Sequence, residues 1–484
     1  MNPIMLFLFW IIFVLVFTNH LIKFPIFEDE AINLLLSERL FNNPISNFFI
    51  FIRHGFLPSL GWLIFLVRLF VEDSLLAGRL LNVLLASSLF FWLYLIKKEY
   101  KLPMRFFILS STLFLFSPIL FLNSRVALFD TAAMVFSAWS LYFFTLILRK
   151  PKPIFQILFF IVFLSCLLIK FTSLFILPSL VYLLFVEYMK TKKLVVYKRQ
   201  IILLLFTLVC FVLIISPFYS LVSGDLGTGL VFNLNTNAIL TRIYHNFWLF
   251  LNWSNVYYPP LLLSILFFVI LILDKRKAHE NGFLMALLVW FMVSLLTMTI
   301  FNRFYYPRHI LILLIPLNII PVFILQRYSL KISVMVVAFL ILIRLTLFGN
   351  LIFDTTFTKA EIAKEDRFQY FEDYTSGIEI DNIGKYLSES AANKRIVIWL
   401  DGSWVMEYGI RRVLKNNPNI EFKSFVDFES QRFGIPGKVD GDSSELNYVI
   451  VNKYRPLNLK DLILEREFSW MGYHPVYLYI VSPQ

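Results

Sequence analysis

Long apolar runs separated by short charged loops fill the first 350 residues of the chain. A helix needs about 17–25 apolar residues to cross a bilayer. Eleven runs come close to that length, near residues 3–20, 78–96, 106–122, 132–148, 154–169, 171–186, 201–221, 257–273, 282–300, 309–325 and 331–349. This pattern predicts a polytopic α-helical membrane protein with about 11 transmembrane helices.

Two weaker apolar patterns lie between the first two runs. Residues 57–71 are apolar but short for a span, and Arg68 interrupts them. Residues 31–41 mix apolar and polar positions in the manner of an amphipathic helix. We expect both segments to form helices that lie flat on the outer membrane surface, within a first outer loop of about residues 21–77.

The pattern changes after residue 354, where charged and apolar residues occur in ordinary proportions. Short runs typical of strands cover residues 395–400, 447–452 and 475–481, and runs typical of helices cover 404–415 and 457–467. We therefore expect a transmembrane domain over residues 1–350 and a C-terminal α/β domain over residues 354–484.

Composition narrows the class of protein further. The chain is 59% hydrophobic, with a mean hydropathy of +0.74, which excludes a soluble globule because ordinary domains are only about 45–50% apolar. The net charge of +12 does not indicate nucleic-acid binding, since residues 1–353 hold 28 Lys and Arg against 12 Asp and Glu, whereas residues 354–484 hold 16 against 20. Cys166 and Cys210 lie inside apolar runs, so they predict neither a disulfide framework nor a metal site.

The basic residues also predict the orientation in the membrane. Five loops carry 17 Lys and Arg between them, at residues 97–105, 149–152, 190–199, 275–277 and 327–331, and eleven spans place all five on one side. Cytoplasmic loops are enriched in Lys and Arg. We therefore expect a multi-pass protein of the plasma (inner) membrane, with its amino terminus in the cytoplasm and its C-terminal domain extracytoplasmic.

Candidate chemistry gathers at the outer ends of the spans. Glu28, Asp29 and Glu30 follow the first span directly, where they form either part of a site or a solvated turn. The wider set of ionisable groups at this face is Glu28, Asp29, Glu30, Arg53, His54, Arg125, Asp130, Lys170, Asp225, Arg242, His245, Arg303, Arg308 and His309. Cations beside acids suit a site that holds an anionic headgroup and activates a nucleophile. For any single Arg or His, however, snorkelling or helix-end pairing is the better explanation.

Four segments in this order resemble a known family. They are Asp29-Glu30-Ala31 after the first span, Arg53 to Leu60 with a surface helix and Ala77-Gly78-Arg79-Leu80, Ser117-Pro118 with Arg125 to Thr131, and Tyr306-Pro307-Arg308-His309 before Leu314-Ile315-Pro316. Over roughly residues 1–350 the chain resembles the GT-C type glycosyltransferases that use polyprenyl-phosphate sugars, in the protein mannosyltransferase and aminoarabinose transferase branch.

The resemblance implies an activity and a set of residue roles. It implies transfer of a sugar, a hexose or a pentose, from a polyprenyl-phosphate donor to an extracytoplasmic acceptor that is a protein, a lipid or a cell-wall glycan. Carried over, Asp29 with Glu30 becomes the catalytic base, Asp130 supports the site, and Arg53 or His54 with Arg308 binds the donor phosphate. We also expect Asp29 and Asp130 to line one cavity.

The residues themselves are compatible with this chemistry. Sugar transfer needs a base for the acceptor hydroxyl and a stabilised phosphate leaving group. No Gly-rich phosphate loop precedes the spans, which favours a donor delivered through the lipid over a nucleotide sugar. A divalent metal near Glu28, Asp29, Glu30 and His54 stays an open question at this stage.

Two other functions stay open. A transporter or flippase for lipid-linked saccharides would bury charges near the bilayer midplane and show repeat symmetry, whereas here the charges gather at one face. A sensor or scaffold would use the outer domain to bind a ligand. For a transferase, the predicted role of the outer domain is to cover the site or to help select the acceptor.

Overall fold

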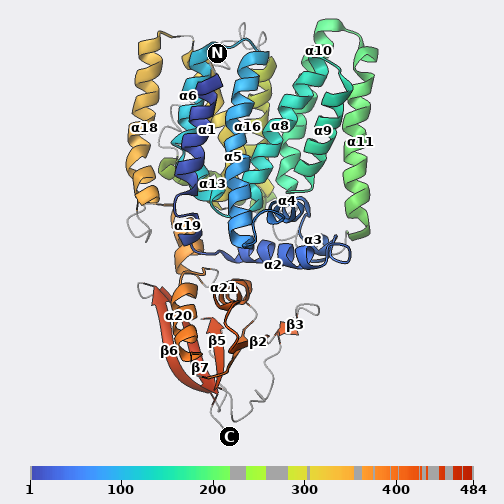
Figure 1. Cartoon of the computed structure of the whole chain (residues 1–484). Coiled ribbons are helices and arrows are strands. Elements are labelled where there is room, and N and C mark those ends of the chain that lie inside the picture. The colour runs from blue at the N-terminus through green and yellow to red at the C-terminus, as the bar shows by residue number, and fades with distance from the viewer. Residues whose placement is uncertain are drawn as a thin grey trace. The chain divides into compact units, whose positions relative to one another are not determined.

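A computed structural model of the chain describes residues 3–218, 236–257, 282–301, 306–326, 328–353, 362–373, 376–392, 394–401, 403–424, 426–427, 432–433, 446–452, 462–470 and 473–481. The chain divides into two compact units (Figure 1). The first unit consists of Met1–Leu21 and Ser37–Ala363, and the second of Ile22–Leu36 and Lys364–Gln484.

Helices make up the described part of the first unit. They are α1 (Pro3–Thr18), α3 (Ile50–Arg53), α4 (Ser59–Arg68), α5 (Ser74–Glu99), α6 (Met104–Leu115), α7 (Pro118–Ser124), α8 (Phe129–Arg149), α9 (Pro153–Leu167), η2 (Phe171–Ile176), α10 (Leu177–Thr191), η3 (Leu194–Tyr197), α11 (Lys198–Ile215), η4 (Ser216–Phe218), α13 (Thr236–Tyr257), α16 (Gly282–Phe301), η5 (Pro307–Leu313), α17 (Leu314–Leu325) and α18 (Leu330–Phe353). Two further helices, η1 (Leu21–Lys23) and α2 (Glu28–Asn42), contain residues of both units.

The polytopic helical fold predicted from the apolar runs is confirmed. Within the described residues, seven helical segments are long and apolar enough to cross a membrane, or up to nine if each of two bent helix pairs is one span, rather than the eleven expected. The predicted span over 154–169 corresponds to α9, which has only 15 residues. Apart from Tyr257, the predicted span over 257–273 lies outside the described residues. Helix α13 was not predicted.

Proline explains one of the bent pairs. Helices α6 and α7 meet at an angle of 61°, and Pro118 is the first residue of α7. Proline lacks an N–H and its ring clashes with the preceding turn, so a helix breaks before it. The two expected surface helices are present as α2 and α4, and their position flat on a membrane stays a prediction.

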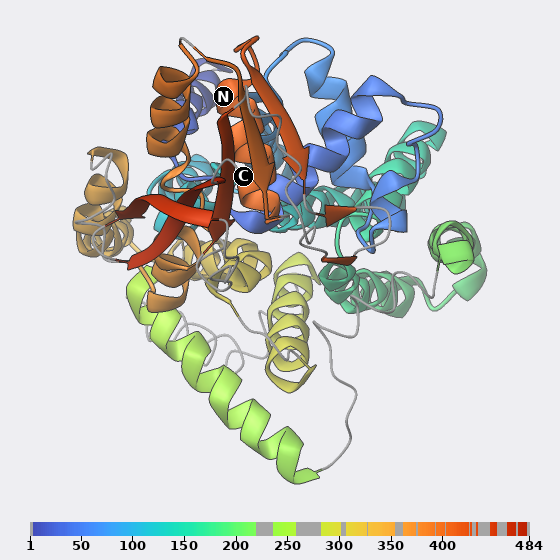
Figure 2. The same ribbon diagram turned by 90° about the horizontal axis from the view of Figure 1, so that it is seen from below.

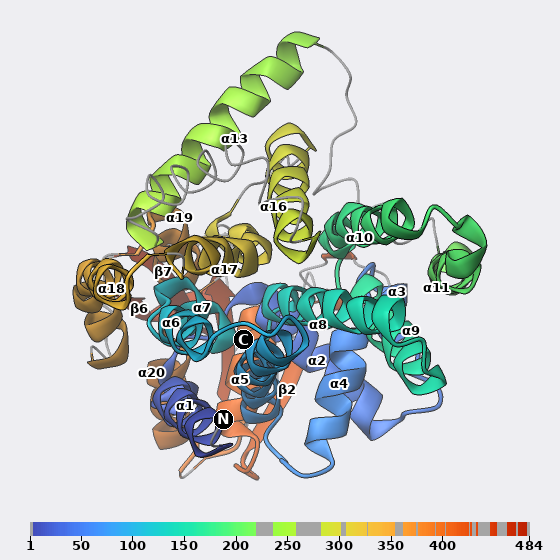
Figure 3. The same cartoon turned by 90° about the horizontal axis from the view of Figure 1, so that it is seen from above.

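Helices α5 and α8 lie in the middle of the first unit, with α1 and α6 on one side and α9 and α10 on the other (Figure 3). Polar side chains join the two central helices. The indole of Trp92 on α5 donates to the carbonyl of Ala138 on α8 at 2.7 Å, and Trp139 donates to the hydroxyl of Ser88 at 3.0 Å. The first bond satisfies an indole N–H that is fully buried, and the second joins two half-buried side chains. Together they connect the two helices at a defined register.

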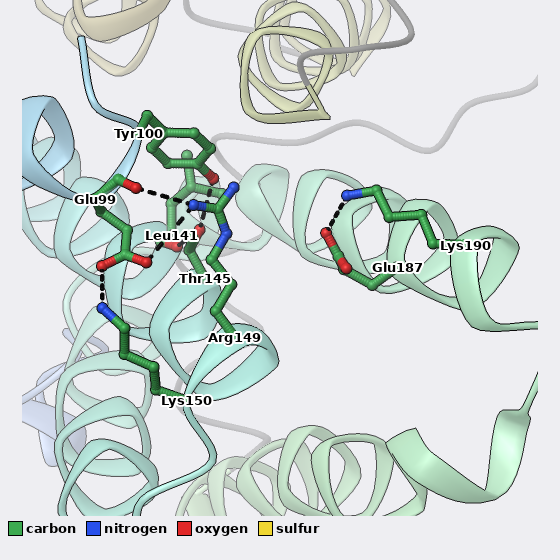
Figure 4. Close-up of polar contacts among 8 residues, drawn as sticks. All are labelled: Glu99, Tyr100, Leu141, Thr145, Arg149, Lys150, Glu187 and Lys190. Carbon is green, nitrogen blue, oxygen red and sulfur yellow. Dashed lines mark hydrogen bonds and ion pairs between the residues drawn. The ribbon is translucent and has the colours of Figure 1, made fainter.

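A charged network lies where α5 and α8 end (Figure 4). The Glu99 carboxylate accepts a hydrogen bond from Lys150 Nζ at 2.7 Å and lies 3.6 Å from Arg149 Nη1. The Arg149 guanidinium also stacks over the Tyr100 ring, 4.0 Å from its centroid. The network joins the predicted basic loop over 97–105 to the one over 149–152.

Two further contacts bring other basic loops to this end. Arg105 donates to the carbonyls of Gln326 and Tyr328. The charge of Glu187 on α10 acts on Tyr100, and the carbonyl of Glu187 accepts a hydrogen bond from the Tyr197 hydroxyl at 3.1 Å. Four of the five basic loops therefore lie at one end of the bundle, and the fifth, residues 275–277, lies outside the described residues.

The second unit is an α/β unit that also contains the start of α2 (Figures 1 and 2). Its other elements are α19 (Lys364–Arg367), the π-helix η6 (Phe368–Glu372), α20 (Ile380–Ser390), β1 (Ile396–Leu400), α21 (Trp404–Leu414), β2 (Ile420–Ser424), β3 (Val426–Asp427), β4 (Arg432–Phe433), β5 (Leu446–Asn452), β6 (Leu462–Trp470) and β7 (Tyr473–Val481). The main sheet has the order β2-β1-β5-β7-β6. Strand β1 runs parallel to β2 and β5, whereas β7 runs antiparallel to β5 and β6.

Most of the elements predicted for this unit are confirmed, and one is wrong. The strands over 395–400, 447–452 and 475–481 and the helix over 404–415 are present as β1, β5, β7 and α21. The expected helix over 457–467 is instead the strand β6 from Leu462 onward. Pairing with β7 explains the difference, since Leu462 and Leu464 lie opposite Val481 and Tyr479 in an antiparallel ladder whose hydrogen bonds only the folded sheet supplies.

Helices α20 and α21 pack closely against each other. A Cβ atom on Gly409 would lie 2.1 Å from Ile380 Cδ1, and one on Gly384 would lie 2.4 Å from Val413 Cγ1. A larger residue at either position would require the facing side chain to move, so glycine suits this close approach. The apolar faces of the two helices are buried, with Ile383 and Ile410 fully inaccessible to solvent.

Candidate functional site

The three consecutive acids form the first turn of α2. Negative side chains are favourable there because the unpaired N–H groups carry partial positive charge. Glu30 is fully buried, and Glu28 and Asp29 are half-buried. This placement differs from the alternative of a solvated turn.

Glu28 is held within the second unit by the first turn of α21. Its carboxylate accepts hydrogen bonds from the amides of Trp404 at 3.0 Å and Val405 at 2.9 Å, and from the hydroxyl of Ser403 at 3.3 Å. Burial raises the pKa of the Glu28 carboxyl to about 7, and the neighbouring charge of Asp29 also raises it. The hydrogen bonds from the two amides lower this pKa but do not cancel the effect of burial.

A second group of charges lies in the first unit, around Asp130. This residue is in the first turn of α8, and η2 and η5 pack against that helix. Asp130 Oδ1 lies 2.5 Å from Lys170 Nζ, and the charges of His309 and Arg308 also act on the carboxylate. The Asp130 cluster, as we name these four residues, thus contains one acid and three basic groups.

Local structure fixes the basic members from η5. The Arg308 guanidinium is buried and lies over the Tyr306 ring, 5.3 Å from its centroid. His309 Nδ1 accepts a hydrogen bond from the Tyr306 amide at 3.4 Å, which closes a capping box at the start of η5. Pro307 at the first helical position restricts the backbone further.

Sequence reasoning chose two of these four residues, Asp130 and Arg308, for the site. Lys170 and His309 were in the wider set of outer-face groups but received no role. The available signal for Lys170 was a single lysine between two apolar runs, where a buried or half-buried cation needs a carboxylate partner. That signal indicates a partner without identifying Asp130.

Buried side chains of α5 and of the turn before α8 hold the end of α1. Arg79 donates to the carbonyl of Leu21 at 2.7 Å, and Arg125 donates to the carbonyls of Asn19 and His20 at 2.7 and 2.9 Å. The accepting carbonyls lie just after α1, and the two guanidinium groups supply donors for them in a buried place. These contacts fix the segment Asn19 to Leu21 that follows α1, and Leu21 lies eight residues before Asp29.

Asn82 fixes the turn that leads into α8. Its side-chain amide donates to the carbonyls of Val126 at 2.6 Å and Leu128 at 2.9 Å. Asn82 itself is fully buried on α5. The start of α8, and with it Asp130, is therefore tied to the central helix.

Arg53 and His54 lie at the end of α3. Arg53 is exposed, and His54 is half-buried. Burial and the neighbouring charges of Arg39 and Arg53 lower the pKa of His54, which favours the neutral imidazole at neutral pH. A neutral imidazole attracts an anion less strongly than a guanidinium, and the phosphate-binding role of both residues stays a prediction.

The remaining expectations concern a metal and a shared cavity. Among the described residues, no group of three or more His, Cys, Asp or Glu side chains is placed to hold a metal ion. Asp29 belongs to the second unit and Asp130 to the first. Their common cavity stays a prediction, as do the roles of Asp29 and Glu30. Asp225 and Arg303 lie outside the described residues.

Comparisons with known proteins bear on the fold. No protein-family model matches the chain, and no curated protein matches it. Among solved structures, the crystal structure of ArnT from Cupriavidus metallidurans bound to undecaprenyl phosphate matches with a TM-score of 0.59 and 12% sequence identity, over 100% of both chains. The apo structure of the same protein matches with a TM-score of 0.57 and 12% identity, over 98% of this chain and 97% of that one. The chain has a GT-C-like fold, so the family resemblance predicted from the sequence is confirmed at the level of the fold.

Proposed function

We propose that this protein is an integral-membrane glycosyltransferase that moves a sugar from a polyprenyl-phosphate donor to an extracytoplasmic acceptor. The observation that carries the proposal is the end-to-end likeness to ArnT, a protein whose crystal structure contains undecaprenyl phosphate. The Asp130 cluster adds independent support, because it supplies cations at one end of the bundle for an anionic headgroup.

In the proposed reaction, the acceptor hydroxyl attacks the anomeric carbon of the donor sugar. The new bond joins the acceptor oxygen to that carbon, and the bond from the carbon to the phosphate oxygen breaks. The electron pair leaves with the polyprenyl phosphate, and Asp29 takes the proton of the hydroxyl. Arg308 and Lys170 stabilise the charge on the departing phosphate, and Asp130 orients Lys170 through their ion pair.

The distribution of charge supports an extracytoplasmic site. Helix α8 is 21 residues long, so its two ends lie about 30 Å apart at 1.5 Å per residue. Asp130 is at one end, and the network of Glu99, Arg149 and Lys150 is at the other, beside the basic loops (Figure 4). The positive-inside rule assigns the basic end to the cytoplasm, which places the Asp130 end outside in the proposed topology.

The proposal is tested by incubating the purified full-length protein with extracted lipid-linked sugars and following donor and product by mass spectrometry. The wild-type protein is expected to consume donor and form a new glycosidic bond. Asp29→Asn keeps the size of the side chain but removes the base, so turnover should fall by about 10²–10⁴-fold. Asp381→Asn, at an exposed position on α20, is the matched control and should retain full turnover.

Two results would overturn the proposal. Turnover that is unchanged in Asp29→Asn would remove the base assignment. Movement of lipid-linked saccharide across vesicle membranes without any new glycosidic bond would identify a transporter instead.

A further inference from the structure

The N-terminus of α21 lacks a cap from its own N-cap side chain. Ser403 occupies the N-cap position but makes no side-chain hydrogen bond to the first turn. The first four N–H groups of a helix have no partner within the helix. Two of them, those of Trp404 and Val405, donate to Glu28, and the Ser403 hydroxyl does the same. A residue about 375 positions earlier in the chain therefore caps this helix.

The turn that presents these amides is itself fixed. Asp401 Oδ1 accepts a hydrogen bond from the Ser403 amide at 3.0 Å, and Asp401 Oδ2 accepts one from the Asn452 amide at 2.7 Å. Asp401 follows the last residue of β1, and Asn452 is the last residue of β5. The carboxyl ends of two neighbouring parallel strands are thus joined at the place where α21 begins.

The carboxyl ends of β1 and β5 lie where open α/β sheets usually bind a ligand. From β1 the chain passes through α21 to β2 on one side of β1, and it then reaches β5 on the other side. In open α/β sheets, ligands bind outside the carboxyl ends of the strands where the strand order changes direction in this way. Anions bind there because helix N-termini point toward them. In this chain the carboxyl group of Glu28 occupies that position and accepts the hydrogen bonds.

Other contacts hold the residues before Glu28 against the same unit. The Ile26 carbonyl accepts a hydrogen bond from the Gly377 amide at 2.8 Å, and Phe27 forms a β-bridge with Ser376. A Cβ atom on Gly377 would lie 2.9 Å from the Ile26 oxygen, so glycine permits this approach.

Aromatic packing adds to these backbone contacts. The rings of Phe24 and Phe27 pack on Tyr370, with centroids 5.5 and 5.2 Å from its ring. Both phenylalanines are buried, with 2% and 3% of their surface exposed. The segment from Phe24 to Glu28 is therefore fixed by backbone, aromatic and carboxylate contacts.

We propose that Glu28 is a positioning residue: by occupying the ligand position of the α/β unit, it fixes the first turn of α2 and so the direction of the Asp29 carboxylate. The inference rests on the proposed function for the role of Asp29. It gives the C-terminal α/β unit a task in the reaction that does not depend on binding the acceptor. Glu28 acts through its neighbour and does not contact the reacting atoms.

The experiment separates positioning from simple helix capping. Glu28→Ala removes both the cap and the hold on α2. The double variant Glu28→Ala with Ser403→Asp restores a local cap to α21, because Asp is a favoured N-cap residue. It does not restore the hydrogen bonds that connect the first turn of α2 to α21. Glu389→Ala, at an exposed position on α20, is the control. All variants are made in the full-length protein in detergent.

Two measurements are made on each variant. In Glu28→Ala, kcat is expected to fall by about 10–10²-fold with little change in KM for the donor, since a displacement of about 1 Å is enough for such a loss. In the double variant, the thermal stability of the protein returns but kcat stays low. Hydrogen exchange of the amides at the start of α2 is expected to increase in both variants and to stay unchanged in Glu389→Ala.

Each result decides the inference. Recovery of kcat together with stability in the double variant would show that Glu28 only caps α21, and the positioning role would be lost. Unchanged exchange at the start of α2 in Glu28→Ala would also overturn it. If the wild-type protein turned over no lipid-linked sugar while exchange increased as expected, the hold of Glu28 on α2 would stand and the proposed function would fail.

Discussion

The two units of the chain hold a partly or fully buried carboxylate by opposite means. In the first unit, Asp130 is paired with a cation, since Lys170 Nζ lies 2.5 Å away and Arg308 and His309 add further basic groups. In the second unit, Glu28 is surrounded by neutral donors, two backbone amides and one hydroxyl. Both carboxylates lie at helix N-termini, Asp130 at that of α8 and Glu28 at those of its own helix α2 and of α21.

The difference indicates what each carboxylate can do. A carboxylate beside two cations, here Lys170 and Arg308, leaves net positive charge around it, which is suited to holding a phosphate. A carboxylate held by neutral amide and hydroxyl donors keeps a fixed direction, but its surroundings add no positive charge for a ligand. We infer that the first arrangement serves binding and the second serves positioning.

The largest effect is expected from breaking the ion pair in the first unit. Asp130→Asn leaves Lys170 without its carboxylate, so the donor phosphate loses an oriented cation and turnover should fall by about 10²-fold or more. Stability should fall by about 1–3 kcal/mol, the usual cost of leaving a buried polar group without its partner. Turnover and thermal unfolding of the purified variants would be compared.

A double-mutant cycle sharpens this test. Lys170→Gln alone should also reduce turnover, and the variant that carries both changes should lose much less than the sum of the two single effects, because the residues act as a pair. Additive effects in the cycle would show that Asp130 and Lys170 act independently, and the role of Asp130 as an orienting residue would be wrong.

Features that depend on local pattern were predictable from the sequence. Apolar runs of sufficient length located ten of the eleven expected spans on described helices, and the placement of charges at span ends identified Asp130 and Arg308. The same reasoning failed for β6, because Leu462 to Glu467 fits either a helix or a strand until its partner β7 is known. Amphipathic helix and strand patterns overlap in short segments.

Contacts between distant residues were not predictable in this way. The bond between Glu28 and the N-terminus of α21 joins positions 28 and 404, and no local pattern in either segment indicates the other. The absence of an alternative cap from Ser403 also depends on its side-chain direction, which the sequence does not contain. Long-range polar contacts are decided by the tertiary fold, so they become visible only in the structure.

An intermediate effect is expected from the pH dependence of Glu28. Its pKa is raised from 4.5 to about 7 in the folded protein, so between these values the folded state binds more protons than the unfolded state. The contribution of Glu28 to stability is therefore fully present below about pH 4.5 and falls as the pH rises toward 7. Because the glutamine in Glu28→Gln does not titrate, the stability of this variant lacks the part of the pH dependence that comes from Glu28.

Thermal unfolding of the full-length wild-type protein and of Glu28→Gln, each measured between pH 5 and pH 8, would test this expectation. As the pH rises from 5 to 8, the free energy of unfolding of Glu28→Gln should increase by about 1–3 kcal/mol relative to that of the wild-type protein. Parallel curves of stability against pH for the two proteins would mean that burial does not raise the pKa of Glu28. Asp130 and Glu28 would then differ only in the groups that they contact.

The smallest effect is expected at Glu99, a carboxylate of the first unit that contacts Arg149 and Lys150 (Figure 4). Lys150 is 53% exposed and Arg149 is 33% exposed, so solvent screens both ion pairs. Lys150→Ala should cost at most about 1 kcal/mol of stability, because Arg149 still contacts Glu99, and it should leave donor turnover unchanged. A tenfold fall in turnover in Lys150→Ala would place this end of the bundle in the reaction and would contradict the assignment of the chemistry to the Asp130 end.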